Sequence, residues 1–303
     1  MALADSVPDG ALTLRVTDLT SVPEAPRPDS FYRHSPDIKS SIRDLWDKRH
    51  IVATLAERDL RAQYKEAALG FLWAILVPLS YLGVLTVIFS RVKAFKVPGP
   101  PVPFILYAYT GLICWQFFTN ALGRGSSSIL GNKQLLNKVY FPRECFPISV
   151  IIGQIVNSSA AILPLGVLMA IKGFPPKVEG LWVPLFLLIE LVFVTGVIMG
   201  VSALIMNVRD LLQVVPVVTG FGMFASPVIW PFSKIVHAGH GIAQVYSFVN
   251  PMGPVLDNVK RTLLQGLAPD WPFVLIGAVS ACGYLIVGYR LFKRLEVDFA
   301  DIA

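Results

Sequence analysis

Long apolar runs dominate the chain between residues 67 and 289. Five of them lack any charged residue, and a sixth contains only Glu190. The runs are Ala67–Ser90, Val97–Gly123, Cys145–Ile171, Leu181–Val208, Leu211–Ser233 and Trp271–Tyr289. Each is close to or longer than the roughly 20 residues that a helix needs to cross a bilayer. The pattern therefore predicts an all-α polytopic membrane protein with six transmembrane helices.

An amphipathic pattern precedes the first apolar run. Ser35 and Pro36 are typical of a helix start. Apolar residues then recur at steps of three and four as far as Leu60, while basic residues occupy the other faces. We interpret residues 35–66 as an amphipathic interface helix that lies on anionic membrane headgroups. Packing against a partner subunit would need the same pattern, so this alternative stays open.

The segment Lys234–Asp270 is apolar in part but unsuited to a full span. Its uncharged stretch is short and carries Pro251 and Pro254. A re-entrant or interfacial helical hairpin before the last span fits this pattern better. Within it Val255, Val259 and Leu263 share a helical face, and Gly266 is placed to end that helix.

The distribution of charged residues predicts on which side of the membrane the two termini lie. Charged residues make up only 15% of the sequence, too few for a soluble protein built from amphipathic helices. Lys and Arg are more numerous in the loops on the N-terminal side of the membrane, which predicts that both termini are cytoplasmic. The net charge of +6 then reflects these loops rather than nucleic-acid binding. We expect four parts: a flexible cytoplasmic tail (1–34), the interface helix (35–66), the six-span domain (67–291) and a cytoplasmic C-terminal tail (292–303).

Candidate catalytic chemistry is sparse. The chain has no Gly-x-x-x-x-Gly-Lys-Ser/Thr motif, so we do not expect it to bind ATP by that route. His237 and His240 have a metal-like spacing without an evident third ligand, so we expect no metal site. Glu190 is either a substrate or proton contact or, as we favour, a polar clamp between helices. Without a nucleophile–base pair, an enzyme is disfavoured.

Two other regions offer binding surfaces. The residues Phe104, Tyr107, Trp115 and Phe118 share one face of the second span, where sugar rings could stack. Lipid contact or ordinary packing would use the same residues. The polar loop from Arg124 to Glu144 combines basic and aromatic residues, which suits docking of a soluble partner or a helix on the headgroups.

Several stretches, taken in order, resemble ABC-2 type permeases that export polysaccharides. They are Arg58–Lys65, Leu69–Leu79, Gly111–Phe118, Lys138–Glu144, Asn207–Asp210, Ser226–Val228, Asn250–Pro251 and Gly288–Glu296. Each is weak alone, but their order and their positions between the spans make the set specific. The family includes exporters of O-antigen, teichoic acid and actinobacterial galactan.

The resemblance implies a transport subunit rather than an enzyme. Two copies would form a homodimer in the bacterial plasma membrane, joined to two copies of a separate ABC nucleotide-binding subunit that holds ATP and Mg. The substrate would be a polysaccharide linked to a polyprenyl diphosphate. The loop between spans two and three would couple to the ATPase through Lys133, Lys138, Tyr140, Phe141, Pro142, Arg143 and Glu144.

Two hypotheses on substrate contact follow from this resemblance. Arg58, Arg61 and Lys65 would meet the lipid diphosphate at the inner leaflet. The aromatic face of the second span, with Phe224 of the fifth, would line a channel between the two chains. The rival functions are an ABC-2 exporter of a small molecule or drug and an ion-coupled carrier centred on Glu190.

Overall fold

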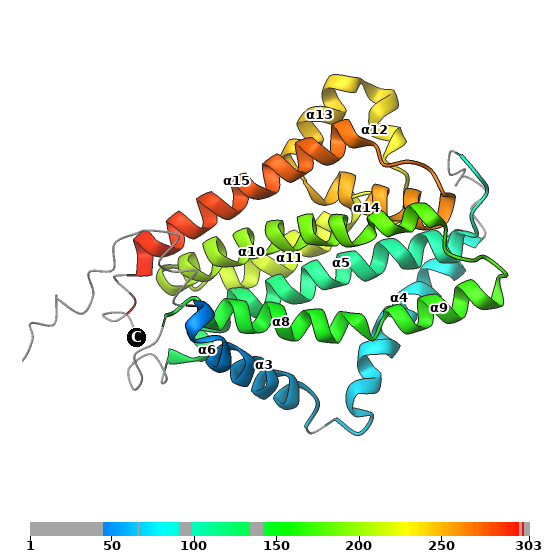
Figure 1. Cartoon of the computed structure of the whole chain (residues 1–303). Coiled ribbons are helices and arrows are strands. Elements are labelled where there is room, and N and C mark those ends of the chain that lie inside the picture. The colour runs from blue at the N-terminus through cyan, green and yellow to red at the C-terminus, as the bar shows by residue number, and fades with distance from the viewer. Residues whose placement is uncertain (1–44, 66, 91–98, 134–141, 297–298, 300–303) are drawn as a thin grey trace, which may run out of the picture. The chain divides into compact units, whose positions relative to one another are not determined.

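The computed structural model describes residues 45–65, 67–90, 99–133 and 142–296, together with residue 299 (Figure 1). All regular elements in these ranges are helical, which confirms the all-α prediction. The predicted tail (1–34) and the predicted helix start at Ser35 and Pro36 lie outside the described residues.

The long elements pack side by side as a helical bundle (Figure 1). In chain order the first half consists of α3 (Arg49–Tyr64), η2 (Gly70–Leu72), α4 (Trp73–Ser90), α5 (Phe104–Ser126), α6 (Ser128–Gly131), α8 (Cys145–Ser159) and α9 (Ile162–Ile171). The second half consists of η3 (Val178–Trp182), α10 (Val183–Asn207), α11 (Leu211–Ala225), α12 (Ser233–Ala238), α13 (His240–Val249), α14 (Met252–Lys260), η4 (Arg261–Gln265) and α15 (Trp271–Leu295).

Four stretches of the described residues are long and apolar enough to cross a membrane: Gly70–Ile88, Cys145–Ile171, Val178–Asn207 and Trp271–Leu295. They match four of the six predicted spans. The second predicted span forms α5, which is long but interrupts its apolar surface with Gln116 and Asn120. The six-span count therefore stays a prediction.

The fifth predicted span is shorter as a helix than we expected. We predicted Leu211–Ser233, whereas α11 has 15 residues and ends at Ala225. Ser226 is extended, with ψ 149°, and Pro227 follows it. A residue before proline is driven out of the helical region by contact with the proline ring, so the helix stops there.

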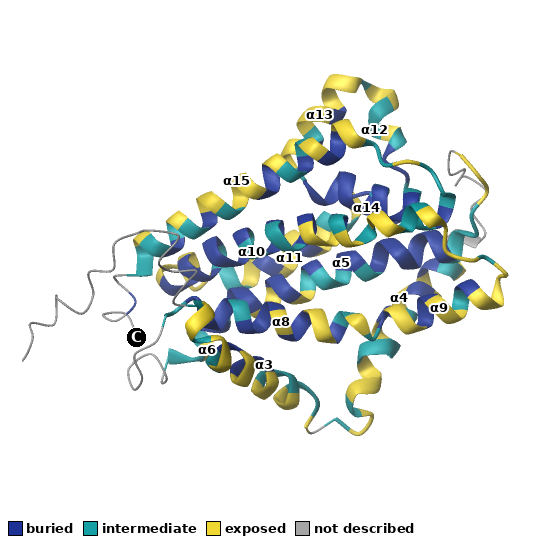
Figure 2. Ribbon diagram, in the orientation of Figure 1, coloured by how far each residue is buried: buried dark blue, intermediate teal, exposed yellow. Residues whose placement is uncertain are grey.

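Helices α10 and α15 are in close backbone contact. Helices α10 and α15 meet at Gly196 and Gly288, where a Cβ on Gly288 would lie 1.9 Å from the Gly196 carbonyl oxygen. Small residues allow two helix backbones to approach in this way. The buried residues gather along α5 and α10, while α4 and α11 present exposed apolar faces (Figure 2).

The amphipathic helix packs against its own chain. In α3 the residues Val52, Leu55 and Ala56 are buried, and the first two form part of a cluster with Phe146 of α8 and Phe292 of α15. The apolar stripe is therefore covered by the bundle. Its position on a membrane surface stays a prediction. We call this end of the bundle, with α3, α6 and the C-terminal part of α15, the α3 end.

The segment between α11 and α15 folds as three short helices and one π-helical turn, none of them long enough for a full span. Val255 and Val259 of α14 are buried in the main core. The turn ends at Gly266, which has φ +65°. This left-handed backbone favours glycine, and it confirms the predicted helix end. Re-entry into a membrane stays a prediction.

Candidate functional site

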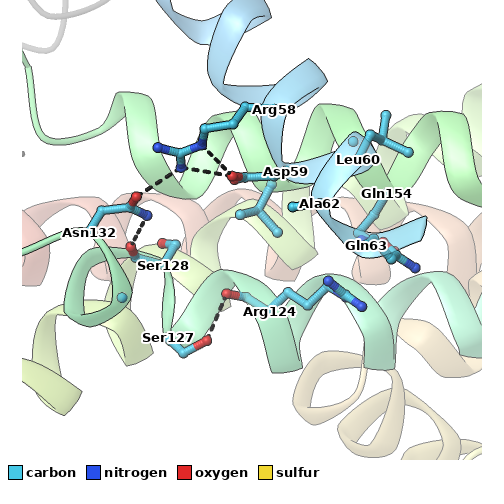
Figure 3. A pocket seen from close by; sticks show the side chains of 13 residues that line it. Arg58, Asp59, Leu60, Ala62, Gln63, Arg124, Ser127, Ser128, Asn132 and Gln154 are labelled. Atoms are coloured by element: carbon cyan, nitrogen blue, oxygen red, sulfur yellow. Dashed lines mark hydrogen bonds and ion pairs between the residues drawn. The ribbon is translucent and has the colours of Figure 1, made fainter. Parts of the chain in front are cut away.

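A polar pocket of about 500 Å³ lies at the α3 end (Figure 3). Its walls come from α3, from the α5–α6 junction and from α8. The polar lining residues are Arg58, Asp59, Gln63, Arg124, Ser127, Ser128, Asn132 and Gln154. These residues are far apart in the sequence, so the helix packing described above creates the site.

Arg58 ties α3 to α6 across this pocket. Its Nη2 donates to Oδ1 of Asp59 at 2.7 Å and to Oδ1 of Asn132 at 2.8 Å. The Asn132 amide in turn donates to the Ser128 carbonyl at 2.8 Å. The Arg58 charge is therefore partly neutralised by Asp59 before any ligand arrives.

Arg124 enters the same pocket from the last turn of α5. Among the described residues its exposed guanidinium has neither an ion pair nor a hydrogen bond. Burial raises the pKa of the nearby Tyr64 hydroxyl above its ordinary value, and the Arg124 charge acts in the opposite direction. From the sequence we placed Arg124 at the start of the docking loop and not among the lipid diphosphate contacts. The signal for it is a single arginine that ends an otherwise uncharged run.

A chain of amide and hydroxyl groups supports one wall of the pocket. The Tyr64 hydroxyl donates to the Asn157 side-chain oxygen. The Asn157 Nδ2 then donates to Oε1 of Gln154 at 3.2 Å. This direction of donation leaves Nε2 of Gln154 as a donor in the wall.

The structure separates the three residues that we predicted as lipid diphosphate contacts. Arg58 lines the pocket, but Arg61 and Lys65 do not. Arg61 forms an exposed ion pair with Glu57 one turn earlier in α3. Lys65 is exposed directly after the helix.

The aromatic residues predicted to line a substrate path are in part buried in the bundle and in part exposed on its surface. Tyr107, Trp115 and Phe118 are buried, and Phe118 stacks on Phe193 with ring centroids 5.7 Å apart. Phe104 is partly buried against the same core. Phe224 of α11 is 71% exposed. A channel-lining role concerns an assembly of two chains, and it stays a prediction.

The predicted coupling loop is described only at its ends. Lys138, Tyr140 and Phe141 lie outside the described residues, whereas Lys133 and Pro142 to Glu144 lie within them. Buried Glu144 forms an ion pair with Lys293 of α15, and Arg143 donates to the Glu296 backbone carbonyl. Burial and the neighbouring Glu144 raise the pKa of the Glu296 carboxyl. The end of the loop is thus attached to the last helix.

Glu190 lies inside the bundle, on α10 beside Cys114 of α5. Neither carboxylate oxygen has a hydrogen bond to a nitrogen or oxygen atom of the described residues. The sequence did not indicate another deeply buried charge, Lys260 of α14. Its Nζ donates to the Pro227 carbonyl at 2.6 Å and lies 4.1 Å from the Tyr107 ring centroid.

Comparison with known proteins identifies the family. Residues 51–263 match the model of the ABC-2 type transporter family. The chain belongs to this family. An ABC-2 transporter chain is a multi-pass membrane protein, in agreement with the apolar helices described above.

Three relatives cover most of the chain. The O-antigen export system permease protein RfbA of Myxococcus xanthus is 28% identical over 86% of this chain and 98% of its own length. The protein of the same name from Klebsiella pneumoniae is 24% identical over 83% of this chain and 94% of its own. The polysialic acid transport protein KpsM of Escherichia coli is 23% identical over 81% and 93%, respectively.

Proposed function

We propose that this protein is the permease subunit of an ABC exporter that moves a polyprenyl-diphosphate-linked polysaccharide across the bacterial plasma membrane. The observation that carries the proposal is similarity over more than four fifths of the chain to permeases named for O-antigen export and polysialic acid transport. The sequence has no phosphate-loop motif, so two copies of a separate subunit would bind ATP and Mg.

The proposed transporter is a homodimer in which each chain crosses the membrane six times. The crossings are α4, α5, α8 with α9, α10, α11 and α15. The bias of basic residues supports a cytoplasmic location for the α3 end, and with it for both termini.

The coupling loop Asn132–Glu144 would insert into the ATPase. Its described end supports this role, because Glu144 is paired with Lys293 of α15 and lies directly before α8. A force on the loop would therefore act on two long helices. ATP binding could change the packing of the bundle through this attachment.

The substrate would enter at the α3 end and leave between the two chains. Arg58, Arg61 and Lys65 would meet the lipid diphosphate. On α5 the aromatic residues lie close to α11, since a Cβ on Gly222 would contact Trp115 at 3.1 Å. A small displacement of α11, which carries Phe224, would uncover Trp115 for contact with sugar rings.

Purification from native membranes in mild detergent tests the proposal. Mass spectrometry of the bound proteins should find a stoichiometric subunit with a phosphate-loop ATPase domain. Deletion of the permease should then trap a lipid-linked glycan at the cytoplasmic face. Failure to recover an ATPase with the intact dimer would contradict the proposal. Normal glycan export in the deletion strain, with loss of small-molecule efflux, would favour a drug exporter.

A further inference from the structure

We propose that the pocket between α3, the α5–α6 junction and α8 binds a phosphate-ester headgroup, with Arg124 as the principal cationic ligand. The inference rests on the proposed function, because it names the site at which the diphosphate of the carried lipid would bind. It also adds residues that charge and depth in the sequence did not indicate.

The charges of the pocket favour an anion. Two guanidinium groups and one carboxylate line it, which leaves one net positive charge. Asp59 already accepts two hydrogen bonds from Arg58, whereas Arg124 has no partner among the described residues. A guanidinium is planar and binds phosphate oxygens through two parallel hydrogen bonds. Arg124 is therefore the group with this capacity unused.

A donor in the pocket wall completes the site. Gln154 lines the pocket, and its Nε2 donates no hydrogen bond to the described residues. The hydrogen bond from Asn157 holds Oε1 and so fixes the amide orientation. Nε2 is open to the pocket rather than enclosed in the core, so a bound phosphate oxygen can accept its hydrogen bond. The pocket volume of about 500 Å³ suits a headgroup of this size.

The surroundings favour a phosphate that carries an apolar chain. Ile152, Ile155 and Val156 flank Gln154 on α8, and all three side chains are exposed. An apolar chain attached to the phosphate could lie along this surface. Two sources share this chemistry, namely a polyprenyl diphosphate and an anionic phospholipid. The experiment below distinguishes them.

Binding of farnesyl diphosphate to the purified permease–ATPase complex tests the inference. We expect saturable binding that Arg124→Gln weakens about tenfold, because one charge-assisted contact is lost. Asp59→Asn should strengthen binding, since it removes the competing carboxylate and frees Arg58. The matched control is Arg209→Gln, which removes an exposed arginine outside the pocket and should leave the affinity unchanged.

Competing ligands identify the source. Displacement by polyprenyl diphosphate and not by phosphatidylglycerol would support a substrate site, and equal displacement would assign the phosphate-ester site to bulk lipid. The inference would be overturned if farnesol bound with the same affinity as farnesyl diphosphate, or if Arg124→Gln left the affinity for farnesyl diphosphate unchanged. Retention of the ATPase by each variant shows that it is folded. Loss of the ATPase from the wild-type complex would instead refute the proposed function, since the probe can be bound by the permease alone.

Discussion

Two cations, Lys260 and Arg124, lie at opposite ends of α5. Lys260 of α14 packs against the first turns of α5, whereas Arg124 belongs to its last turn. About 25 Å of helix separates Tyr107, which Lys260 covers, from Arg124. Lys260 is completely buried and donates to the Pro227 and Val228 carbonyls. Arg124 is exposed and has no partner among the described residues.

The difference separates a structural cation from one that is available to a ligand. The carbonyls bound by Lys260 belong to the non-helical stretch after α11, where the backbone has lost its helical partners. In an apolar interior such groups must be satisfied by another part of the chain. Arg124 satisfies no such buried carbonyl among the described residues, so its guanidinium is available to bind a ligand.

The largest effect should come from Gly111→Ala, at the Lys260 end of α5. A Cβ there would lie 2.2 Å from the Val228 carbonyl oxygen, which would push that loop away from Lys260. Overpacking against backbone costs about 3 kcal/mol. Thermal unfolding of the purified protein in detergent should show a clear loss of stability.

Gly123→Ala is the matched control on the same helix. No heavy atom lies within 4 Å of a Cβ at Gly123, and alanine favours the helix over glycine by roughly 1 kcal/mol. We expect unchanged or slightly higher stability. An equal loss in both variants would mean that the contact with Val228 is not the cause.

Lys293→Met tests a buried ion pair at the α3 end. Lys293 pairs with Glu144, which would be left buried and without its counter-charge. Because Lys293 is itself partly exposed, we expect a destabilisation of about 2 kcal/mol rather than the full cost of a stranded charge. The double variant with Glu144→Gln removes the stranded charge and should regain part of the unfolding temperature. If the two changes are simply additive, the pair is not coupled.

Lys260→Met tests the structural cation itself. It would remove the donor to the Pro227 carbonyl and leave that oxygen unsatisfied in the core, a loss of about 2 kcal/mol. Lower unfolding temperature together with easier proteolysis between Ser226 and Phe232 is the expected result. Lys260→Arg keeps the charge but has a larger side chain, so a loss of stability in that variant would not be informative. The decisive variant is Lys260→Met, and full stability there would contradict a structural role.

Arg124→Gln should have the smallest effect on stability and a large effect on transport. Exposed side chains without partners usually change stability by no more than about 0.5 kcal/mol. Export of the glycan should fall while the unfolding temperature and ATPase binding stay unchanged. A loss of stability similar to that of Lys260→Met would show that the two cations do not differ as proposed.

The sequence predicted the elements better than their ends. Uncharged runs located each long helix, because apolar surface in a membrane needs no periodic polar face. They did not show that α11 stops at Ala225 or that the third run divides into α8 and α9 around residues 160 and 161. Proline effects on the backbone decide where these helices break. A proline alone does not predict a break, because Pro78 lies inside α4 and that helix continues past it.

The site was predicted only in part for a similar reason. Arg58 was assigned from its charge and its expected depth at the inner leaflet, and it does line the pocket. Arg61, one turn further, pairs with Glu57 instead. Arg124 and Gln154 come from other helices, and no sequence spacing relates them to Arg58. Their convergence depends on how α3, α5 and α8 pack.

The sequence by itself determined the helical class, the positions of the long helices, the end of the hairpin at Gly266 and the similarity to ABC-2 permeases. These features follow from local composition and from residue order. Only the tertiary structure decided which charged groups are buried, which are paired and which share a pocket. Helix packing brings together residues that lie many turns apart, and burial then sets whether a charge such as Lys260 must be satisfied inside the chain or, as for Arg124, can meet a ligand.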